Sequence, residues 1–117
     1  MKRCYLAGPM RGYPEMNHPA FFAGEELLVD AGWIVFNPAR LDKELDQFDP
    51  KRDEPLPQVH YVRRDLGILM DYLKPSSSDA VVVLPGWESS TGATAEVGVA
   101  RWLNLPVIPL AQAIRRS

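Results

Sequence analysis

Short apolar runs alternate with segments of helical spacing along the whole chain, and the strongest run is Ala-Val-Val-Val-Leu at residues 80–84. An apolar run without polar alternation is typical of a strand buried on both faces, as in parallel sheets. The other predicted strands are residues 3–7, 33–36 and 105–109, and 33–36 is again a continuous apolar run. We therefore expect a parallel sheet with helices on both faces.

Helical segments separate these strands, and we expect helices at residues 19–31, 39–45, 58–73, 93–103 and 111–116. The helix at 58–73 is the clearest, because apolar residues recur there at steps of three and four. Its predicted buried stripe consists of Val59, Val62, Leu66, Leu69 and Leu73. In a sheet of this kind, ligands bind at the carboxyl ends of the strands.

The chain has 117 residues and a net charge of -2, so we expect one domain over residues 1–117 and no nucleic-acid polymer as a partner. No apolar run approaches the ~20 residues of a membrane span. The segment before the first strand is too short for a signal peptide, so we expect a cytoplasmic protein that does not bind a membrane.

Cys4 is the only cysteine, which excludes an internal disulfide and a cysteine-cluster metal site. Its apolar neighbours favour a buried strand thiol, and a catalytic thiolate is the alternative. His18 and His60 share no ligand spacing with acidic residues. We therefore predict neither a metal site nor a cofactor.

Residues 37–57 carry many charges and the prolines 38, 50, 55 and 57. A structureless loop of this length is unusual in a compact domain and is often functional. The helix at 39–45 would shorten it, and we interpret the rest as a candidate mobile lid over a site.

Two predicted loops, residues 8–19 and 85–92, lie at the carboxyl edge of the sheet. Arg11 in the first loop is flanked by Gly8 and Gly12. A guanidinium there can hold a phosphate through two hydrogen bonds, and the glycines let a ligand approach the backbone. The alternative is a solvated loop arginine.

The second loop combines Ser89, Ser90, Thr91 and Gly92 with the start of a helix. Free backbone N–H groups at a helix start form an anion site, whereas a serine or threonine there also serves as a simple cap. The local sequence leaves both interpretations open. Glu96 on the same helix is either a nucleophile or base that faces the site, or a solvated glutamate.

Asp65 lies on the margin of the buried stripe of the 58–73 helix. Poor solvation there would raise its pKa and suit a proton donor, and a salt bridge to Arg63 or Arg64 is the alternative. Asp79 precedes the strand at 80–84, a position more typical of a turn cap than of chemistry.

Taken together, these residues resemble the nucleoside 2-deoxyribosyltransferase superfamily, and most closely its 2′-deoxynucleoside 5′-phosphate N-hydrolase branch with its short phage and bacterial relatives. The resemblance spans residues 3 to about 108. Its motifs are Tyr-Leu-Ala-Gly-Pro-Met-Arg-Gly at 5–12, Asp65-Leu66 on a helix, Asp79 before a valine-rich strand, and Ser90-x-Gly92-x-x-x-Glu96.

The resemblance implies a flavodoxin/Rossmann-like three-layer α/β fold with a four- to five-stranded parallel sheet, in a homodimer. It implies that Glu96 attacks C1′ of the sugar and that Asp65 assists protonation of the departing base. Residues implied to bind the substrate are Tyr5 at the sugar, Arg11 and Ser90 to Gly92 at its 5′ end, and Gly8, Gly12, Asp79 and Ser89 around them.

Ser90 departs from the members that act on free nucleosides, which tend to carry a carboxylate six positions before the glutamate. A hydroxyl beside helix N–H groups can bind a phosphate, whereas a carboxylate would repel it. Ser90 therefore favours a nucleoside 5′-monophosphate over a free nucleoside as the substrate. By the logic of retaining glycosidases, the products would be free base and sugar phosphate.

Three alternatives stay open. A second base could replace water, which would make the protein a deoxyribosyltransferase. Pro85-Gly86 with Gly92-Ala93-Thr94-Ala95-Glu96 resembles the motif of cytokinin-activating phosphoribohydrolases. The third alternative is a non-catalytic nucleotide-binding or sensor module.

Overall fold

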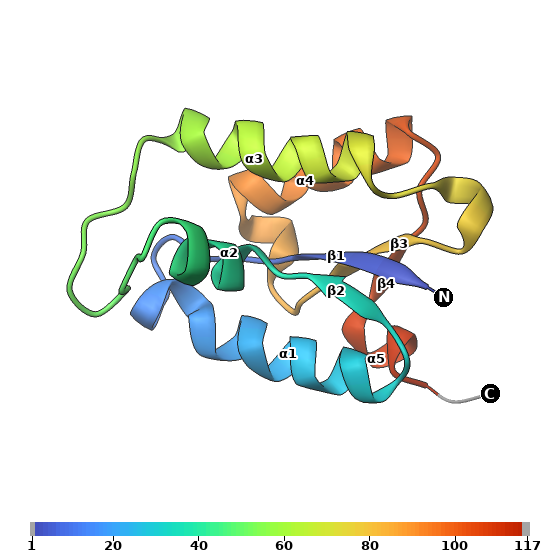
Figure 1. The fold of residues 1–117 in the computed structure, drawn as a ribbon, viewed down its shortest axis with the longest axis horizontal. Helices are drawn as coiled ribbons and strands as arrows, with labels where there is room; N and C mark the ends of the chain where they lie inside the picture. Colours follow the sequence, from blue (N-terminus) through green and yellow to red (C-terminus); the bar gives the residue numbers. More distant parts are fainter. Residues whose placement is uncertain (1, 116–117) are drawn as a thin grey trace.

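A computed structural model describes residues 2–115 of the chain and contains one four-stranded sheet in which all strands are parallel. The strands run in the spatial order β2-β1-β3-β4 (Figure 1). They are β1 (Arg3–Ala7), β2 (Ile34–Phe36), β3 (Ala80–Val83) and β4 (Val107–Pro109). Because β1 lies between β2 and β3, the strand order reverses beside β1, where sheets of this type open a crevice.

Two helices cover each face of the sheet (Figure 1). α1 (His18–Asp30) and α5 (Leu110–Ala113) lie on one face, α3 (Gln58–Asp71) and α4 (Thr91–Trp102) lie on the other, and α2 (Pro38–Leu45) follows β2. This arrangement confirms the predicted α/β, three-layer, flavodoxin/Rossmann-like fold. Within residues 2–115, no helix is both long and apolar enough to cross a membrane.

The period-two geometry of β1 divides its side chains between the two cores. Cys4 and Leu6 pack with residues of α1, whereas Tyr5 and Ala7 pack with residues of α3 and α4. Cys4 is fully buried, and burial raises the pKa of its thiol to about 12, with nearby carboxylates adding to the shift. The thiol is therefore a core group, as the first interpretation of Cys4 proposed.

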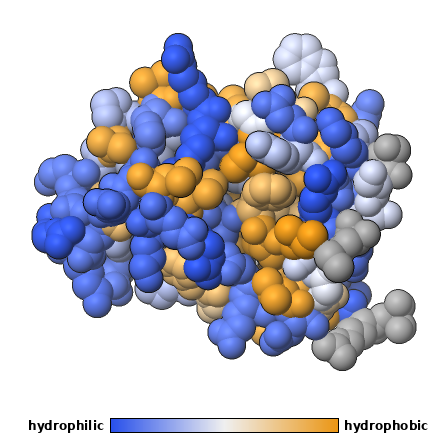
Figure 2. Space-filling view, viewed as in Figure 1, coloured by the Kyte–Doolittle hydropathy of each residue, from blue (hydrophilic) through white to orange (hydrophobic). Residues whose placement is uncertain are grey.

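The prediction that residues 33–36 form a strand buried on both faces is wrong for part of the strand. β2 is at the edge of the sheet, and Ile34 is 44% exposed. Figure 2 shows hydrophobic residues at the surface near the middle of the view, over β2. A continuous apolar run does not distinguish an edge strand from a central one, because only the sheet order decides what covers it.

The predicted stripe of the 58–73 helix is also wrong in its first half. Leu69 and Leu73 are buried, but Val59 is 58% and Val62 39% exposed. Asp65 is buried on the inner side of α3. At this end of the helix, Val62 and Asp65 line a cavity and not a packed core.

Helix boundaries differ from the predictions by a few residues. α4 begins at Thr91, two residues earlier than predicted, because Ser90 caps it: the Ala93 N–H donates to the Ser90 hydroxyl (3.1 Å). The predicted helix at 111–116 is α5, which ends at Ala113. Its predicted last residue, Arg116, lies outside the described residues.

Asp79 fixes the amino end of β3. Its carboxylate is fully buried and accepts hydrogen bonds from the backbone N–H of Arg3 (3.0 Å) and of Lys74 (2.8 Å), and from the Arg3 guanidinium (3.2 Å). Burial opposes ionisation, but these donors outweigh it and lower the pKa of Asp79. Asp79 therefore joins the first strand to the third.

Replacing Asp79 by asparagine is expected to lower the free energy of unfolding by roughly 1–3 kcal/mol, because the amide nitrogen leaves one buried donor without an acceptor. Urea denaturation measures this change, and the matched control is Asp71→Asn at the exposed end of α3. Equal stability of the two variants would contradict the structural role of Asp79.

Candidate active site

A cavity of about 540 Å³ opens at the carboxyl ends of β1 and β3, between α3 and α4. Both loops predicted from the sequence contribute to its wall. Of the predicted site residues, the cavity brings together Tyr5, Gly8, Arg11, Asp65, Ser89, Ser90, Gly92 and Glu96. Its position agrees with the general rule for ligand sites in open parallel sheets.

Two predicted site residues do not line the cavity. Gly12 lies in a turn of the loop after β1 with a φ of 86°. Asp79 is at the amino end of β3, at the sheet edge opposite the cavity. The structure thus gives Asp79 the turn-and-strand role that its position suggested and does not support its place in the predicted substrate-binding set.

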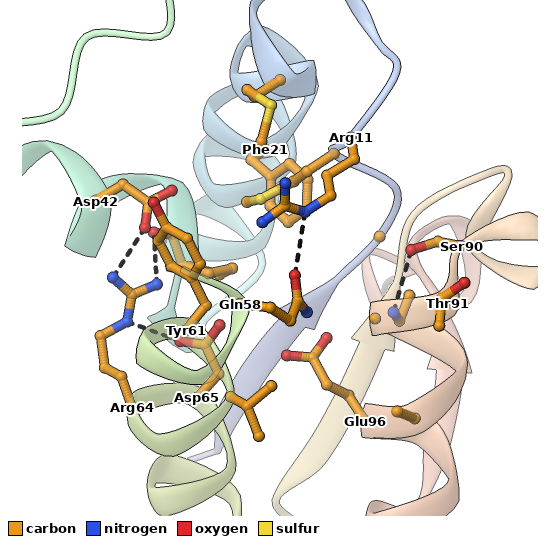
Figure 3. A pocket seen from close by; sticks show the side chains of 18 of the residues that line it. Arg11, Phe21, Asp42, Gln58, Tyr61, Arg64, Asp65, Ser90, Thr91 and Glu96 are labelled. Atoms are coloured by element: carbon orange, nitrogen blue, oxygen red, sulfur yellow. Dashed lines mark hydrogen bonds and ion pairs between the residues drawn. The ribbon is translucent and has the colours of Figure 1, made fainter. Parts of the chain in front are cut away.

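Glu96 extends from the second turn of α4 into the cavity (Figure 3). The Tyr5 hydroxyl donates a hydrogen bond to its Oε2 atom (2.5 Å). Tyr5 reaches Glu96 because this residue of β1 points toward α3 and α4, and its side chain is fully buried. The alternative of a solvated helix glutamate therefore does not describe Glu96.

Burial raises the pKa of Glu96 to about 8. The hydrogen bond from Tyr5 lowers this pKa, the negative charge of Asp65 raises it, and the charge of Arg64 lowers it again. Glu96 is accordingly protonated in most of the free protein at pH 7.

Asp65 faces Glu96 from the opposite wall, on α3 (Figure 3). Burial raises its pKa, while the hydrogen bond from Arg64 Nε to Asp65 Oδ1 (2.8 Å) and the Arg64 charge oppose the shift. Asp65 is thus both a buried carboxyl with a raised pKa and the partner of a salt bridge to Arg64, so the two sequence interpretations hold together. The negative charge of Asp65 raises the pKa of Glu96, so the two carboxyl groups titrate as a coupled pair.

The amino end of α4 forms another part of the wall. Ser90 is the cap, but the backbone N–H groups at Thr91 and Gly92 belong to the first turn, where no helical carbonyl is in reach. Arg11 lies on the other side, exposed, and its Nε donates to the Gln58 side-chain oxygen (3.1 Å). Within residues 2–115, no carboxylate forms an ion pair with Arg11, so its charge is available to an anionic ligand.

Sequence reasoning missed a second group of cavity residues. Most of them are apolar or aromatic, whereas Asp42 pairs with Arg64 and Gln58 with Arg11. The group consists of Met10, Met16, Phe21, Asp42, Phe48, Gln58 and Tyr61. Phe48 follows α2 in the segment interpreted as a lid, so this segment contributes to the wall. The one usable signal was a large aromatic residue in a charged, proline-rich segment.

The protonation of Glu96 predicts a pH-dependent stability. Its pKa is about 8 in the folded protein and near 4.5 in an unfolded chain, so between these values the folded state holds a proton that the unfolded state has lost. The contribution of Glu96 to stability is complete below pH 4.5 and disappears as the pH rises through 8.

Between pH 5 and pH 8, the free energy of unfolding of the wild type should fall by roughly 2–4 kcal/mol more than that of Glu96→Gln, since one pKa unit corresponds to about 1.4 kcal/mol. The glutamine variant has no proton to lose at this position. Urea denaturation at several pH values measures the difference. Parallel curves for the two proteins would show that Glu96 is ionised at neutral pH.

The fold and the cavity define the class of this protein: an α/β protein with an all-parallel sheet and a cavity at the carboxyl edge in which two carboxyl groups face each other. The chain matches, over residues 2–109, the family model described as Domain of unknown function (DUF4406), and it belongs to that family. No curated protein matches the chain.

Proposed function

We propose that the protein hydrolyses the N-glycosidic bond of a deoxynucleoside 5′-monophosphate and releases free base and sugar phosphate. The observation that carries this proposal is the position of Glu96, whose carboxyl group faces Asp65 inside the cavity and is hydrogen bonded by Tyr5. A pair of carboxyl groups around one reaction centre is the usual equipment for cleaving a glycosidic bond with retention.

The amino end of α4 supports a phosphate as the second recognition element. Ser90 and Glu96 are six residues apart, which corresponds to about 9 Å along a helix. Helical side chains lean toward the amino end, so the Glu96 carboxyl lies closer to the first turn than this rise suggests. A pentose can thus place C1′ at Glu96 while its 5′-phosphate accepts hydrogen bonds from the first turn.

The chemistry follows from the two carboxyl groups. Ionised Glu96 forms a bond to C1′ while the bond from C1′ to the base nitrogen breaks, and its electron pair leaves with the base. Asp65 supplies a proton to that base. Water, deprotonated by Asp65, then attacks C1′, which releases Glu96 and leaves a sugar phosphate of retained configuration.

Replacing Arg11 by methionine is expected to raise the KM for a deoxynucleoside monophosphate roughly 10- to 100-fold, since a charge-assisted hydrogen bond contributes about 1.5–3 kcal/mol. The KM for the corresponding free nucleoside should change less than about threefold. Steady-state kinetics with both substrates tests this, and equal effects on the two would exclude a phosphate contact. The exposed Arg63, on α3 but outside the cavity, provides the control Arg63→Met.

The function itself is tested by incubating the protein with common and modified deoxynucleoside monophosphates and detecting free base by chromatography. Faster cleavage of ribonucleotides would favour a phosphoribohydrolase, and base exchange in the presence of a second base would favour a transferase. Saturable binding without base release across the whole panel would favour a binding module. The homodimer stays a prediction, which light scattering tests.

A further inference from the structure

Arg64 lies behind Asp65, where α2 meets α3, and several acceptors share its guanidinium. Its Nη1 atom forms an ion pair with Asp42 Oδ1 (2.8 Å), and its Nε donates to Asp65 Oδ1 (2.8 Å). Longer contacts join it to Asp46 Oδ2 and to the Pro38 carbonyl oxygen, both at 3.4 Å. The Tyr61 ring covers it, 5.5 Å from ring centroid to guanidinium carbon.

Asp42 is the least accessible carboxylate among these partners, with 3% of its surface exposed. Its second oxygen, Oδ2, lies 3.3 Å from Nε2 of His18, a residue of α1 that is also buried. The His18 ring packs against Phe48, 5.8 Å between centroids, so side chains rather than water surround this pair. Asp46 is more accessible and is shared with His60, whose Nε2 lies 2.9 Å from it.

Arg64 thus has one positive charge and two buried carboxylates at equal distance. Both line the cavity, but Asp65 is the one that faces Glu96. A cation paired with Asp65 alone would hold that carboxyl ionised and would prevent it from carrying a proton. A carboxylate on the far side of the same guanidinium takes up part of this charge. It also fixes the plane of the guanidinium, and with it the direction of the hydrogen bond to Asp65.

We propose that Asp42 is a positioning residue for Asp65: it orients Arg64 and shares its charge, so that Asp65 is held by one oxygen and still able to take up and release a proton. The proposal rests on the proposed function, in which Asp65 moves a proton to the departing base. Consistent with it, the pKa of Asp65 is raised by burial, lowered by Arg64 and by a hydrogen bond from Tyr5, and raised again by the charge of Asp42.

The test is an NMR titration of the Asp65 carboxyl carbon in the free protein, with the signal assigned by its loss in Asp65→Asn. In Asp42→Asn, Arg64 acts on Asp65 without its strongest competitor, so the pKa of Asp65 is expected to fall by about one unit or more. Asp42→Glu keeps the charge and should restore most of the wild-type value. Asp71→Asn, on the same helix but exposed, is the control and should change nothing.

A double-mutant cycle separates action through Arg64 from a direct effect of Asp42. In an Arg64→Gln background, Asp42→Asn should shift the pKa of Asp65 by less than half of its effect in the presence of Arg64. If Asp42→Asn alone does not fold, Asp42→Ser, which also removes the charge, takes its place in both backgrounds. An unchanged or raised pKa in Asp42→Asn, or an equal shift in both backgrounds, would overturn the proposal.

The NMR titration of Asp65 does not depend on whether the protein releases a base. A wild-type protein that releases no base would refute the proposed function, whereas the coupling between Asp42 and Asp65 is decided by the titration alone. In an active protein, Asp42→Asn is expected to lower kcat about tenfold and to leave KM within about twofold, because the variant impairs proton transfer and not binding.

Discussion

Replacing Glu96 by glutamine is expected to slow base release from a deoxynucleoside monophosphate by roughly 10³-fold or more, because the amide cannot form the bond to C1′. Glutamine has the size of glutamate, and its oxygen can still accept the hydrogen bond from Tyr5. The variant should therefore fold and bind the nucleotide with a Kd close to that of the wild type. Stopped assays with chromatographic detection of base, together with calorimetric titration, measure both quantities.

The wild-type protein supplies an independent check of the same role. Because burial raises the pKa of Glu96 to about 8, the ionised nucleophile becomes more abundant as the pH rises from 6 to 8. Because the mechanism also needs a proton on Asp65, the value of kcat/KM should pass through a maximum and fall at higher pH, where both carboxyl groups are ionised. A flat profile, or a Glu96→Gln protein that retains the wild-type rate, would remove Glu96 from the mechanism.

Replacing Asp65 by asparagine is expected to lower kcat by about 10²–10⁴-fold for a natural base, since positioned acid–base assistance contributes this much. The asparagine oxygen can still accept the hydrogen bond from Arg64 Nε, so the local structure should be retained. The loss should concern the departure of the base and not the binding of the sugar phosphate, which leaves KM nearly unchanged.

A substrate whose leaving group needs no proton distinguishes these effects. With a 4-nitrophenyl deoxyribose 5-phosphate, the first step should proceed in Asp65→Asn at a rate within about tenfold of the wild type. Burst kinetics isolate this step from the hydrolysis that follows. An equally large loss with both leaving groups would show that Asp65 shapes the cavity and does not donate a proton.

Local sequence was informative wherever the physical cause was local. The run at 80–84 gave a fully buried central strand, and Ser90 with Gly92 marked the start of α4. The two loops at the carboxyl edge followed from chain order alone, because all carboxyl ends of a parallel sheet lie at one edge. Glu96 entered the prediction through a resemblance, since its spacing alone was also compatible with a solvated glutamate.

Other properties depended on contacts between distant segments. The apolar run at 33–36 carried no sign that β2 would be an edge strand with Ile34 exposed. The stripe of α3 predicted Val59 and Val62 as core, because periodicity shows which residues share a face but not what that face meets. Asp42 and Arg64 are 22 positions apart, and nothing in either neighbourhood indicates that they pair.

By itself, the sequence determined the alternation of strands and helices, hence a parallel sheet, the edge at which a ligand binds and the two loops that form this edge. These follow from hydrophobic periodicity and backbone geometry, which act over a few residues. Only the tertiary structure decided that Tyr5, Asp65 and Glu96 meet in one cavity and that the pKa values of both carboxyl groups are raised. Burial and Coulomb interactions fix such protonation states, and both depend on which distant side chains the fold brings into contact.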